Sequence, residues 1–481
     1  MTSYCGAALR RVLGATAVAA SLAVPNLASA QDETFHLAGV LGVPPGGTPL
    51  VAFDISWVDT SINLYFLADR THKQIDVIPI DATPTVLTIK PTGSAAFAGS
   101  PATFPNCTKA GGNDCVGPNG VLTLFNTATN ERELWVGDGP TKNSACIDGQ
   151  PFCSTVKVFA GSDAHLVTII NTFGTARADE LCFDPKDHLV MIANDADSPP
   201  YVNFISTDTG KVVNQIVFSE ASNGIEQCQW SGAQQAFFLN LPEVNGPGDD
   251  SSPGEVVKIS ATGVVLAKFP VDVTQCGGPQ GMALGPDPQI LLGCFAPTSI
   301  NGGALNGPQN SMIIDATDGD IITVLKDQGG ADQVWFEPGS GHYFLAAGGH
   351  LPAGQLGIVD ATTVGGPAVD LQPFNREGCS QFGAPPIPPA PVQPCPPSTG
   401  NPVNQQAVFI GFVGTTTRRI HSVAAFSGNI SPVGNLTAAF VPVPANGGTP
   451  VQSSSIICDP IFTSGCIAIF TSGQITEEAT E

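Results

Sequence analysis

The chain is organised by a phrase that recurs about every fifty residues: a polar amide or acid, a short apolar strand, a turn and a second apolar strand. Examples are DELCFDP followed by HLVMIANDAD, and IEQCQW followed by QAFFLNLPE. A repeat of this length built only from short strands needs neighbouring repeats to bury its apolar faces. The pattern therefore predicts an all-β fold, a β-propeller with four-stranded antiparallel blades.

The repeats can be divided into seven blades. Six are regular and cover 51–90, 119–171, 178–218, 225–270, 280–325 and 332–371. In the seventh, we expect QAVFIGF and HSVAAFS as the second and third strands, and HLAGVLGV near residue 36 to complete the closing sheet. The Pro-rich GAPPIPPAPVQPCPP interrupts the expected inner strand, and proline cannot donate to a central ladder, so we interpret it as an inserted loop.

The first thirty residues differ from the repeats. Arg10 and Arg11 precede an apolar run, and Ala28-Ser29-Ala30 supplies the small residues that a signal peptidase requires. We therefore predict a signal peptide over 1–30, the propeller over 31–445 and a disulfide-tied C-terminal appendage over 446–481. The expected location is secreted or periplasmic.

Charge and hydropathy exclude some partners. The full chain has a formal charge of −23, and without the leader 41 acids face 16 Lys and Arg, a charge of −25. A surface of this sign repels nucleic acid and anionic lipid. Beyond the leader no run reaches the roughly 18 apolar residues of a membrane helix, so we expect neither nucleic acid nor a membrane span.

Cysteine usage agrees with export. Twelve of the 13 cysteines lie beyond the leader, an even number that is typical of disulfides in a secreted chain. Spacing alone does not determine connectivity. Proximity in sequence suggests five pairs, and the similar positions of Cys182 and Cys228 in their repeats predict a bridge between adjacent blades. The proposed pairs are Cys107 with Cys115, Cys146 with Cys153, Cys182 with Cys228, Cys276 with Cys294, Cys379 with Cys395, and Cys458 with Cys466.

The repeat also predicts a site. In a propeller the first polar side chain of each inner strand points at the central channel, and aligning the repeats puts Asp54, Asn119, Glu180, Glu226, Gln280 and Asp332 there. The second strand returns to the same mouth. Its end carries Asp69, Asp138, Asn194 with Asp195, Asn240 and His350.

Crowded carboxylates repel one another unless a cation or protons intervene. Hard oxygen donors favour Ca²⁺ or Mg²⁺, so the expected metal ligands are Asp54, Asn119, Glu180, Glu226 and Asp332. The remaining residues, Gln280, Asp69, Asp138, Asn194, Asn240 and His350, are expected to contact a ligand. The alternative is a water-filled channel in which these polar residues cap strands or bond neighbouring blades.

At these residues the chain resembles two families. FISTDTGKVV and IIDATDGDIITVL are similar to the YVTN-type repeat of secreted bacterial propellers. Pro118-Asn119-Gly120 and Pro279-Gln280-Gly281-Met282 resemble two metal-binding motifs of gluconolactonase and regucalcin-type (SMP-30) propellers. In that family the second motif carries an Asp that binds metal and serves as the proposed base, whereas this chain has Gln280. The resemblance implies a lactonase-like fold more strongly than a lactonase activity.

Two functions from different classes remain open. The first is a secreted scaffold that binds a small ligand or a protein partner through its funnel and loops, with a divalent metal as an option. The second is a metal-dependent lactonase-like or esterase-like hydrolase or lyase at the channel mouth, with Glu180, Glu226 or His350 as catalytic candidates. Whether the chain is an enzyme is left undecided. No haem, flavin or nucleotide is expected.

Overall fold

The computed structural model describes residues 35–42, 50, 52–59, 62, 64–79, 86–99, 115–142, 146, 152–295, 310–326, 328–337, 342–347, 355–361, 405–411, 420–427 and 465–472. By internal contacts the chain divides into Met1–Glu33 and Thr34–Glu481, and all described residues belong to the second unit. No helix in this described part of the chain has the length and hydropathy needed to cross a bilayer.

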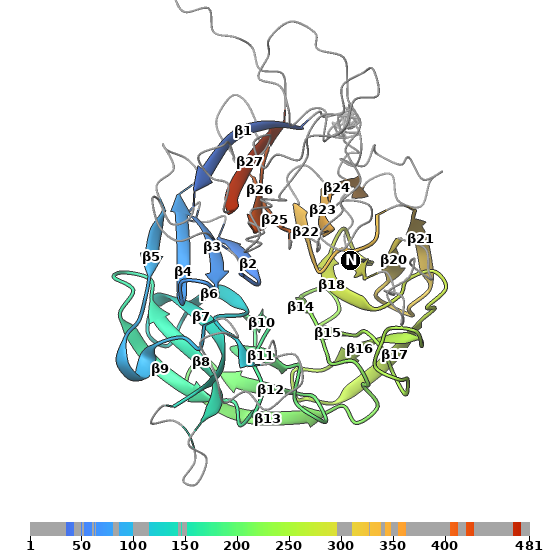
Figure 1. Ribbon diagram of the computed structural model, residues 1–481. Coiled ribbons are helices and arrows are strands. Elements are labelled where there is room, and N and C mark those ends of the chain that lie inside the picture. The colour runs from blue at the N-terminus through green and yellow to red at the C-terminus, as the bar shows by residue number, and fades with distance from the viewer. Residues whose placement is uncertain are drawn as a thin grey trace, which may run out of the picture. The chain divides into compact units, whose positions relative to one another are not determined.

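Five sheets are complete propeller blades, each built from four consecutive antiparallel strands (Figure 1). The first comprises β2 Ser56–Asp59, β3 Leu64–Asp69, β4 Gln74–Pro79 and β5 Leu87–Ile89. The second comprises β6 Val121–Asn126, β7 Glu131–Thr141, β8 Cys153–Ala160 and β9 Leu166–Asn171, and a 3-10 turn, η1 Gly93–Ala95, precedes it. The third comprises β10 Leu181–Asp184, β11 Leu189–Asn194, β12 Tyr201–Ser206 and β13 Lys211–Val217.

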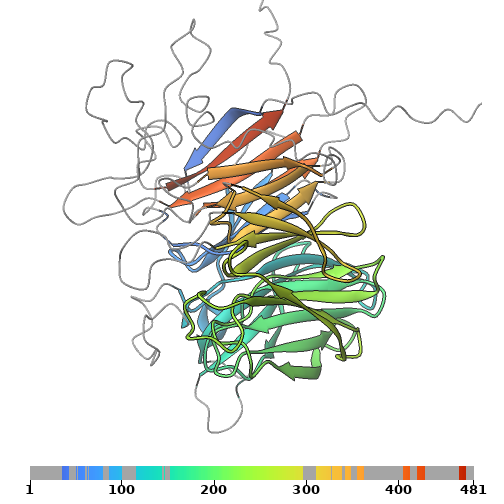
Figure 2. The ribbon, with the colours of Figure 1, turned by 90° about the vertical axis from the view of Figure 1, so that its right-hand side faces the viewer.

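The fourth and fifth blades follow the same plan. The fourth comprises β14 Cys228–Ser231, β15 Ala236–Leu241, β16 Gly254–Ile259 and β17 Val265–Val271. The fifth comprises β18 Pro279–Leu284, β19 Gln289–Cys294, β20 Ser311–Asp315 and β21 Ile321–Leu325. The sheets succeed one another in chain order, as the side view in Figure 2 also shows.

The described residues thus form five complete blades of consecutive strands, where the repeat predicted seven. After the fifth blade, β22 Gln333–Glu337, β23 His342–Ala347 and β24 Gln355–Asp360 form a three-stranded sheet. The prediction counted the sixth repeat, 332–371, as a regular four-stranded blade and expected a less regular seventh that the segment near residue 36 completes. Here the fourth strand is missing from the described residues, and the last sheet is not made of consecutive strands.

That last sheet joins segments from both ends of the second unit. Its order is β1 (Phe35–Gly42), β27 (Gly465–Ser472), β26 (Ile420–Ser427) and β25 (Gln405–Gly411), all antiparallel. The segment near residue 36 joins the closing sheet as predicted. QAVFIGF, expected as a second strand, is instead the edge strand β25, which contacts β2 and β22. β27 comes from the stretch that was expected to form an appendage.

The hydrophobic core lies between consecutive sheets rather than within one. Side chains of one blade pack on those of the next, and at the third and fourth blades the rings of Phe204 and Phe237 meet edge to face with centroids 5.6 Å apart. Similar clusters lie at the four other junctions from the first blade to the β22–β24 sheet. Because each blade buries its faces on its neighbours, the starts of the inner strands are drawn to one central region.

Candidate functional site

The starts of the inner strands carry the polar residues that the repeat predicted. The backbone N–H groups of Asp54, Asn119 and Glu226 each donate to a carbonyl of the second strand, at Ala68, Gly137 and Asn240 respectively, all at 2.9 Å. These three residues are therefore structurally equivalent.

The third blade departs from the predicted alignment by one residue. Asp179, not Glu180, donates its backbone N–H to the second strand, to the carbonyl of Ala193 at 2.8 Å. The backbone carbonyl of Glu180 instead accepts the N–H of Ala193. In the next blade the backbone carbonyl of Gln227 accepts the N–H of Asn240 in the same way. The acid in the predicted slot is thus Asp179. The aligned phrase ADEL offered two adjacent acids, and the sequence alone could not tell which one matches Asp54.

Arg70, which directly follows β3, lies beside the first of these acids. Its guanidinium pairs with Asp54 and donates to Oδ1 of Asn119 from Nε at 3.1 Å and from a terminal nitrogen at 2.9 Å. Burial raises the pKa of the Asp54 carboxyl well above its usual value, against the guanidinium, which lowers it. Asp54 and Asn119, expected as metal ligands, therefore share an arginine.

Arg177 makes the second internal pairing. Its Nε lies 2.5 Å from Oδ2 of Asp179, and a terminal nitrogen lies 2.6 Å from Oδ2 of Asp195. Burial raises the pKa of Asp195 to about 7, although Arg177 lowers it. The repeat predicted neither arginine, because neither occupies a position at which the same residue type recurs from blade to blade.

Three further carboxylates approach this region. Burial, followed by the charges of Glu226 and Asp179, raises the pKa of Glu180 well above its usual value. Burial and the charge of Asp332 do the same for Glu226, and burial with Asp179 raises the pKa of Asp332. Glu180 is 4% exposed, and its Oε2 has no hydrogen-bond partner in the structure.

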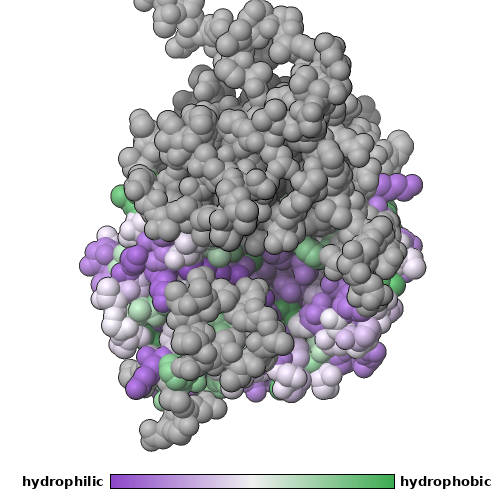
Figure 3. Space-filling view, viewed as in Figure 1, coloured by the Kyte–Doolittle hydropathy of each residue, from purple (hydrophilic) through white to green (hydrophobic). Residues whose placement is uncertain are grey.

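We call this set the acidic funnel: the carboxylates Asp54, Asp179, Glu180, Asp195, Glu226 and Asp332 with the guanidiniums of Arg70 and Arg177. Six acids face two bases, and burial raises the pKa values of Asp54, Glu180, Asp195, Glu226 and Asp332. Figure 3 shows hydrophilic residues gathered around the middle of the face seen in Figure 1. The repeat predicted acids at the centre and did not predict the two arginines that pair with them.

The acidic funnel has some features that suit a metal ion and some that do not. Within the described ranges, no group of three or more His, Cys, Asp or Glu side chains is arranged to hold a metal. The unpartnered Oε2 of Glu180 favours a cation nearby, whereas the arginines already compensate Asp54, Asp179 and Asp195. The predicted Ca²⁺ or Mg²⁺ therefore stays a prediction.

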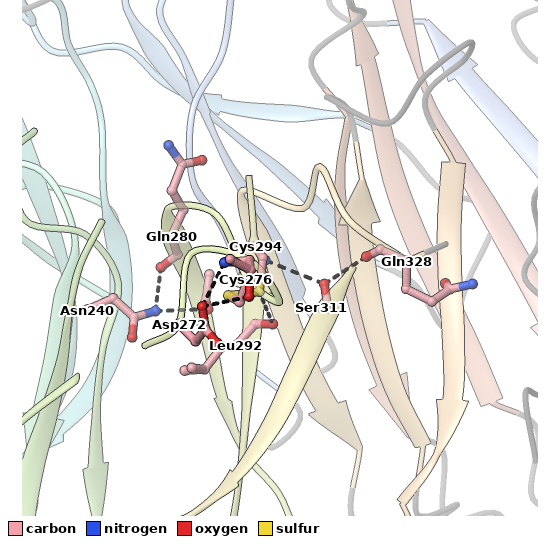
Figure 4. Close-up of a disulfide and its surroundings, with 10 residues drawn as sticks. Asn240, Asp272, Cys276, Gln280, Leu292, Cys294, Ser311 and Gln328 are labelled. Carbon is pink, nitrogen blue, oxygen red and sulfur yellow. Dashed lines mark hydrogen bonds between the residues drawn. A yellow bond between two sulfur atoms is a disulfide. The ribbon is translucent and has the colours of Figure 1, made fainter. Parts of the chain in front are cut away.

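Asn119, expected as a metal ligand, and Asn240, expected to contact a ligand, make hydrogen bonds that connect blades. Asn119 is fully buried, and its Nδ2 donates to the carbonyl of Ala178 in the next blade at 2.9 Å. Asn240 does the same to the carbonyls of Gln280 and Gly281, at 2.8 and 3.0 Å. In Figure 4 the Gln280 side chain extends away from this contact, which its backbone makes.

Asp138 and Asp69 are also committed to internal contacts. Asp138 pairs with the fully buried Lys157 and accepts the N–H of Ala98 at 3.1 Å. Asp69 pairs with the ring of His72 and accepts its backbone N–H at 2.9 Å. Both carboxylates are fully buried. A buried, paired carboxylate fixes local structure and offers little to a ligand, so the alternative of a structural role fits these two residues better.

Asn194 lies in a buried polar network. Its Nδ2 donates to the hydroxyls of Ser154 at 3.0 Å and Thr172 at 3.3 Å, while its Oδ1 has no hydrogen-bond partner. His350, the remaining ligand and catalytic candidate, lies outside the described residues.

Three of the predicted disulfides are confirmed: Cys146–Cys153, Cys182–Cys228 and Cys276–Cys294. The second joins β10 to β14, the adjacent-blade bridge that the equivalent positions predicted. Figure 4 shows the third beside the Asn240 contact. Cys115 is also disulfide-bonded. Its proposed partner Cys107 lies outside the described residues, as do Cys379, Cys395 and Cys458, and Cys466 is described only as part of β27.

Comparisons with known proteins add little about function. No family model matches the chain, and no curated protein matches it, so the YVTN-type and gluconolactonase-type resemblances stay predictions. Among solved structures, the Neurospora crassa Pan2 WD40 domain aligns at 12% identity and a TM-score of 0.45, covering 69% of this chain and 83% of that one. Kuenenia stuttgartiensis hydrazine synthase aligns at 14% and 0.42, covering 63% and 82%. A functionally unknown protein from Desulfotomaculum acetoxidans aligns at 10% and 0.43, covering 76% and 90%.

Proposed function

We propose that the protein is an exported β-propeller scaffold whose acidic funnel binds a small cationic ligand. The observation that carries this proposal is Glu180. Its carboxylate is buried, its Oε2 has no hydrogen-bond partner, and the charges that act most strongly on its pKa come from Glu226, Asp179 and Asp332. A buried carboxylate among other carboxylates is costly unless it is protonated or meets a cation.

The distribution of charge suggests how the ligand enters. Arg70 and Arg177 compensate the acids at the first and third blades, which leaves Glu180, Glu226 and Asp332 as the acids without a direct ion pair among the described contacts. A cation that reaches these three groups replaces their protons. Binding should therefore release protons and weaken as the pH falls.

The acids come from separate blades rather than from one tight cluster. This spacing suits an organic ammonium, which bonds several separated oxygens, as well as a hydrated divalent ion. Both have the same recognition chemistry, and titration separates them. CaCl₂, MgCl₂ and putrescine are each titrated into the protein by calorimetry at about pH 7.5 and about pH 5.5, because binding that displaces carboxyl protons should be weaker at the lower pH.

The matched variants are Glu180→Gln in the funnel and Glu131→Gln at the exposed start of β7. We expect wild type and Glu131→Gln to bind one of the probes with equal affinity, and Glu180→Gln to bind it about tenfold or more weakly, with an unchanged unfolding temperature. Saturable binding by Ca²⁺ or Mg²⁺ alone would identify a metal, and binding by putrescine alone an organic cation. No binding of any probe, or equal binding by Glu180→Gln, would disprove the proposal.

The second candidate is the metal-assisted hydrolase or lyase. The raised pKa of Glu226 favours it, because a carboxyl that burial makes a weaker acid holds its proton more tightly and can donate it as a general acid. Glu226→Gln should then abolish turnover of a responsive lactone or ester while the unfolding temperature stays the same. If a panel of lactones and esters shows no turnover with wild-type protein in Ca²⁺ or Mg²⁺, this candidate fails and the binding function remains.

A further inference from the structure

A cavity of about 310 Å³ lies between the first and second blades. One wall is formed by β3, β4 and β5, chiefly by Leu64, Phe66, Val77 and Leu87. The opposite wall comprises Leu134 and the turn from β8 to β9. None of the acidic-funnel residues lines it. This is a second hollow, in a different part of the propeller from the funnel.

At the junction of the third and fourth blades, an aromatic ring lies in the place that corresponds to this cavity. Val77 pairs with Phe66 across β3 and β4, and Phe204 holds the equivalent position in the third blade, where it pairs with Met191. The Phe204 ring reaches the β16–β17 turn of the following blade and comes within 3.7 Å of where a Cβ at Gly263 would lie. In the first blade this position is Val77, a shorter side chain that lines the cavity together with Phe66. The second and fifth blades also carry aliphatic residues here, Val158 and Ile313.

At the junction of the fourth and fifth blades, an aromatic ring from a different strand packs against the corresponding turn. At the fifth blade, the β20–β21 turn packs Gly319 against the ring of Phe269, so closely that a Cβ at Gly319 would lie 2.6 Å from the ring. An aromatic side chain of the preceding blade thus fills this place at two junctions. The first junction keeps it open at a volume near the lower end of the roughly 300–1,000 Å³ range of small-molecule sites.

The charges at the rim are engaged by the protein. Arg132 pairs with Asp59, which also accepts the hydroxyl of Thr123 at 2.8 Å. The carboxylate of Glu133 accepts Nδ2 of Asn126 at 3.0 Å and Nε1 of Trp135 at 2.9 Å. A ligand entering the cavity therefore meets mainly apolar side chains, and no uncompensated positive charge among the described lining residues selects an anion.

We propose that this cavity is a binding site for a neutral apolar or aromatic small molecule. Its driving force is the removal of apolar surface from water, including that of Leu87, which is 57% exposed on the edge strand β5. The site is independent of the acidic funnel, because the two share no residue.

The test uses the neutral fluorophore N-phenyl-1-naphthylamine, whose emission rises in apolar surroundings. It is titrated into the full-length protein and into Val77→Phe, which supplies the ring found at the third blade. We expect saturable binding at one site in wild type and at least about tenfold weaker binding in Val77→Phe, with an unfolding temperature equal to or above that of wild type. Glu180→Gln should bind the fluorophore as wild type does, which separates this site from the funnel.

A second pair of variants tests the same site in case the Val77→Phe protein does not fold. Leu87→Lys places a charge at the cavity rim, and Leu266→Lys makes the same change at a 54% exposed leucine on the edge strand β17, which does not line the cavity. Leu87→Lys should weaken binding and Leu266→Lys should not. Equal weakening by both, wild-type affinity in folded Val77→Phe, or no saturable binding in wild type would each overturn the proposal.

Discussion

Gln333 on β22 and Ser56 on β2, 277 residues apart, are joined by reciprocal hydrogen bonds. Nε2 of Gln333 donates to the Ser56 carbonyl at 2.7 Å, and the Ser56 hydroxyl donates to Oε1 of Gln333 at 3.0 Å. Gln227 makes the corresponding contact between consecutive blades, accepting the N–H of Met282 at 2.7 Å. The β22–β24 sheet therefore contacts the first blade directly at this point, and Trp57 and Trp335 pack edge to face beside it with ring centroids 5.1 Å apart, while β25 contacts both β2 and β22.

The hydrogen bonds between Gln333 and Ser56 should contribute measurably to the free energy of unfolding. Gln333→Leu keeps the side chain's approximate size but leaves buried polar groups of Ser56 without their partner. We expect a loss of about 1–3 kcal/mol in the free energy of unfolding, measured in urea. Gln215→Leu on β13 removes an exposed glutamine's hydrogen bond to Asn203 and should cost less. Equal losses in the two variants would show that the Ser56 contact does not close the structure.

The Cys182–Cys228 disulfide should stabilise the protein more than Cys146–Cys153 does. The two bridges span 46 and 7 residues, and a longer closed loop restricts the unfolded chain more. Replacing Cys182 and Cys228 together by alanine should cost about 2–4 kcal/mol in urea unfolding, and the Cys146 and Cys153 double variant less. The reverse order would contradict the loop-length argument.

The Lys157–Asp138 pair should be intolerant of losing one partner. Both side chains are fully buried, and the Lys157 ammonium also lies over the ring of Phe97 at 5.1 Å. Lys157→Met leaves a buried carboxylate without its cation and should destabilise the fold by about 3–5 kcal/mol. Adding Asp138→Asn should restore part of this loss. The matched control is Lys268→Met, because the Lys268 side chain is 40% exposed and its ion pairs are screened, so the cost should stay below about 1 kcal/mol.

Asp195 should make stability depend on pH between about 4 and 7. Its pKa rises from 3.8 to about 7 on folding, chiefly because it is buried, so the folded state holds its proton more tightly than the unfolded state does. The stabilisation from this group is complete below about pH 4 and is lost as the pH rises through about 7.

The measurement is the unfolding free energy of wild type and Asp195→Asn at several pH values. The variant should fall less steeply from about pH 4.5 to about pH 7.5, with a difference of about 1 kcal/mol or more over that range. The exposed Asp318, changed to Asn, serves as the control and should keep the wild-type slope. Identical slopes for wild type and Asp195→Asn would refute the assignment.

Local pattern was enough to predict much of the fold. Alternating apolar residues and turn signals placed the inner and second strands of the first five blades, and equivalent positions in two repeats predicted the Cys182–Cys228 bridge. The regular repeat failed at the end of the chain. No local pattern indicated that β25 is an edge strand that contacts both β2 and β22, because that contact depends on segments far apart in the chain.

The candidate site, like the fold, could be predicted from the sequence only in part. The repeat could predict that polar residues gather at the centre, since every blade contributes the same position. It could not predict that Arg70 and Arg177 lie among the acids, that Asp138 is neutralised by Lys157, or that Asn119 and Asn240 connect blades. The sequence by itself determined the type of element and which residue types face the centre, because these follow from local periodicity. Only the tertiary structure decided which charges are paired and where space is left open, because pairing and cavity volume depend on side chains that adjacent blades bring together.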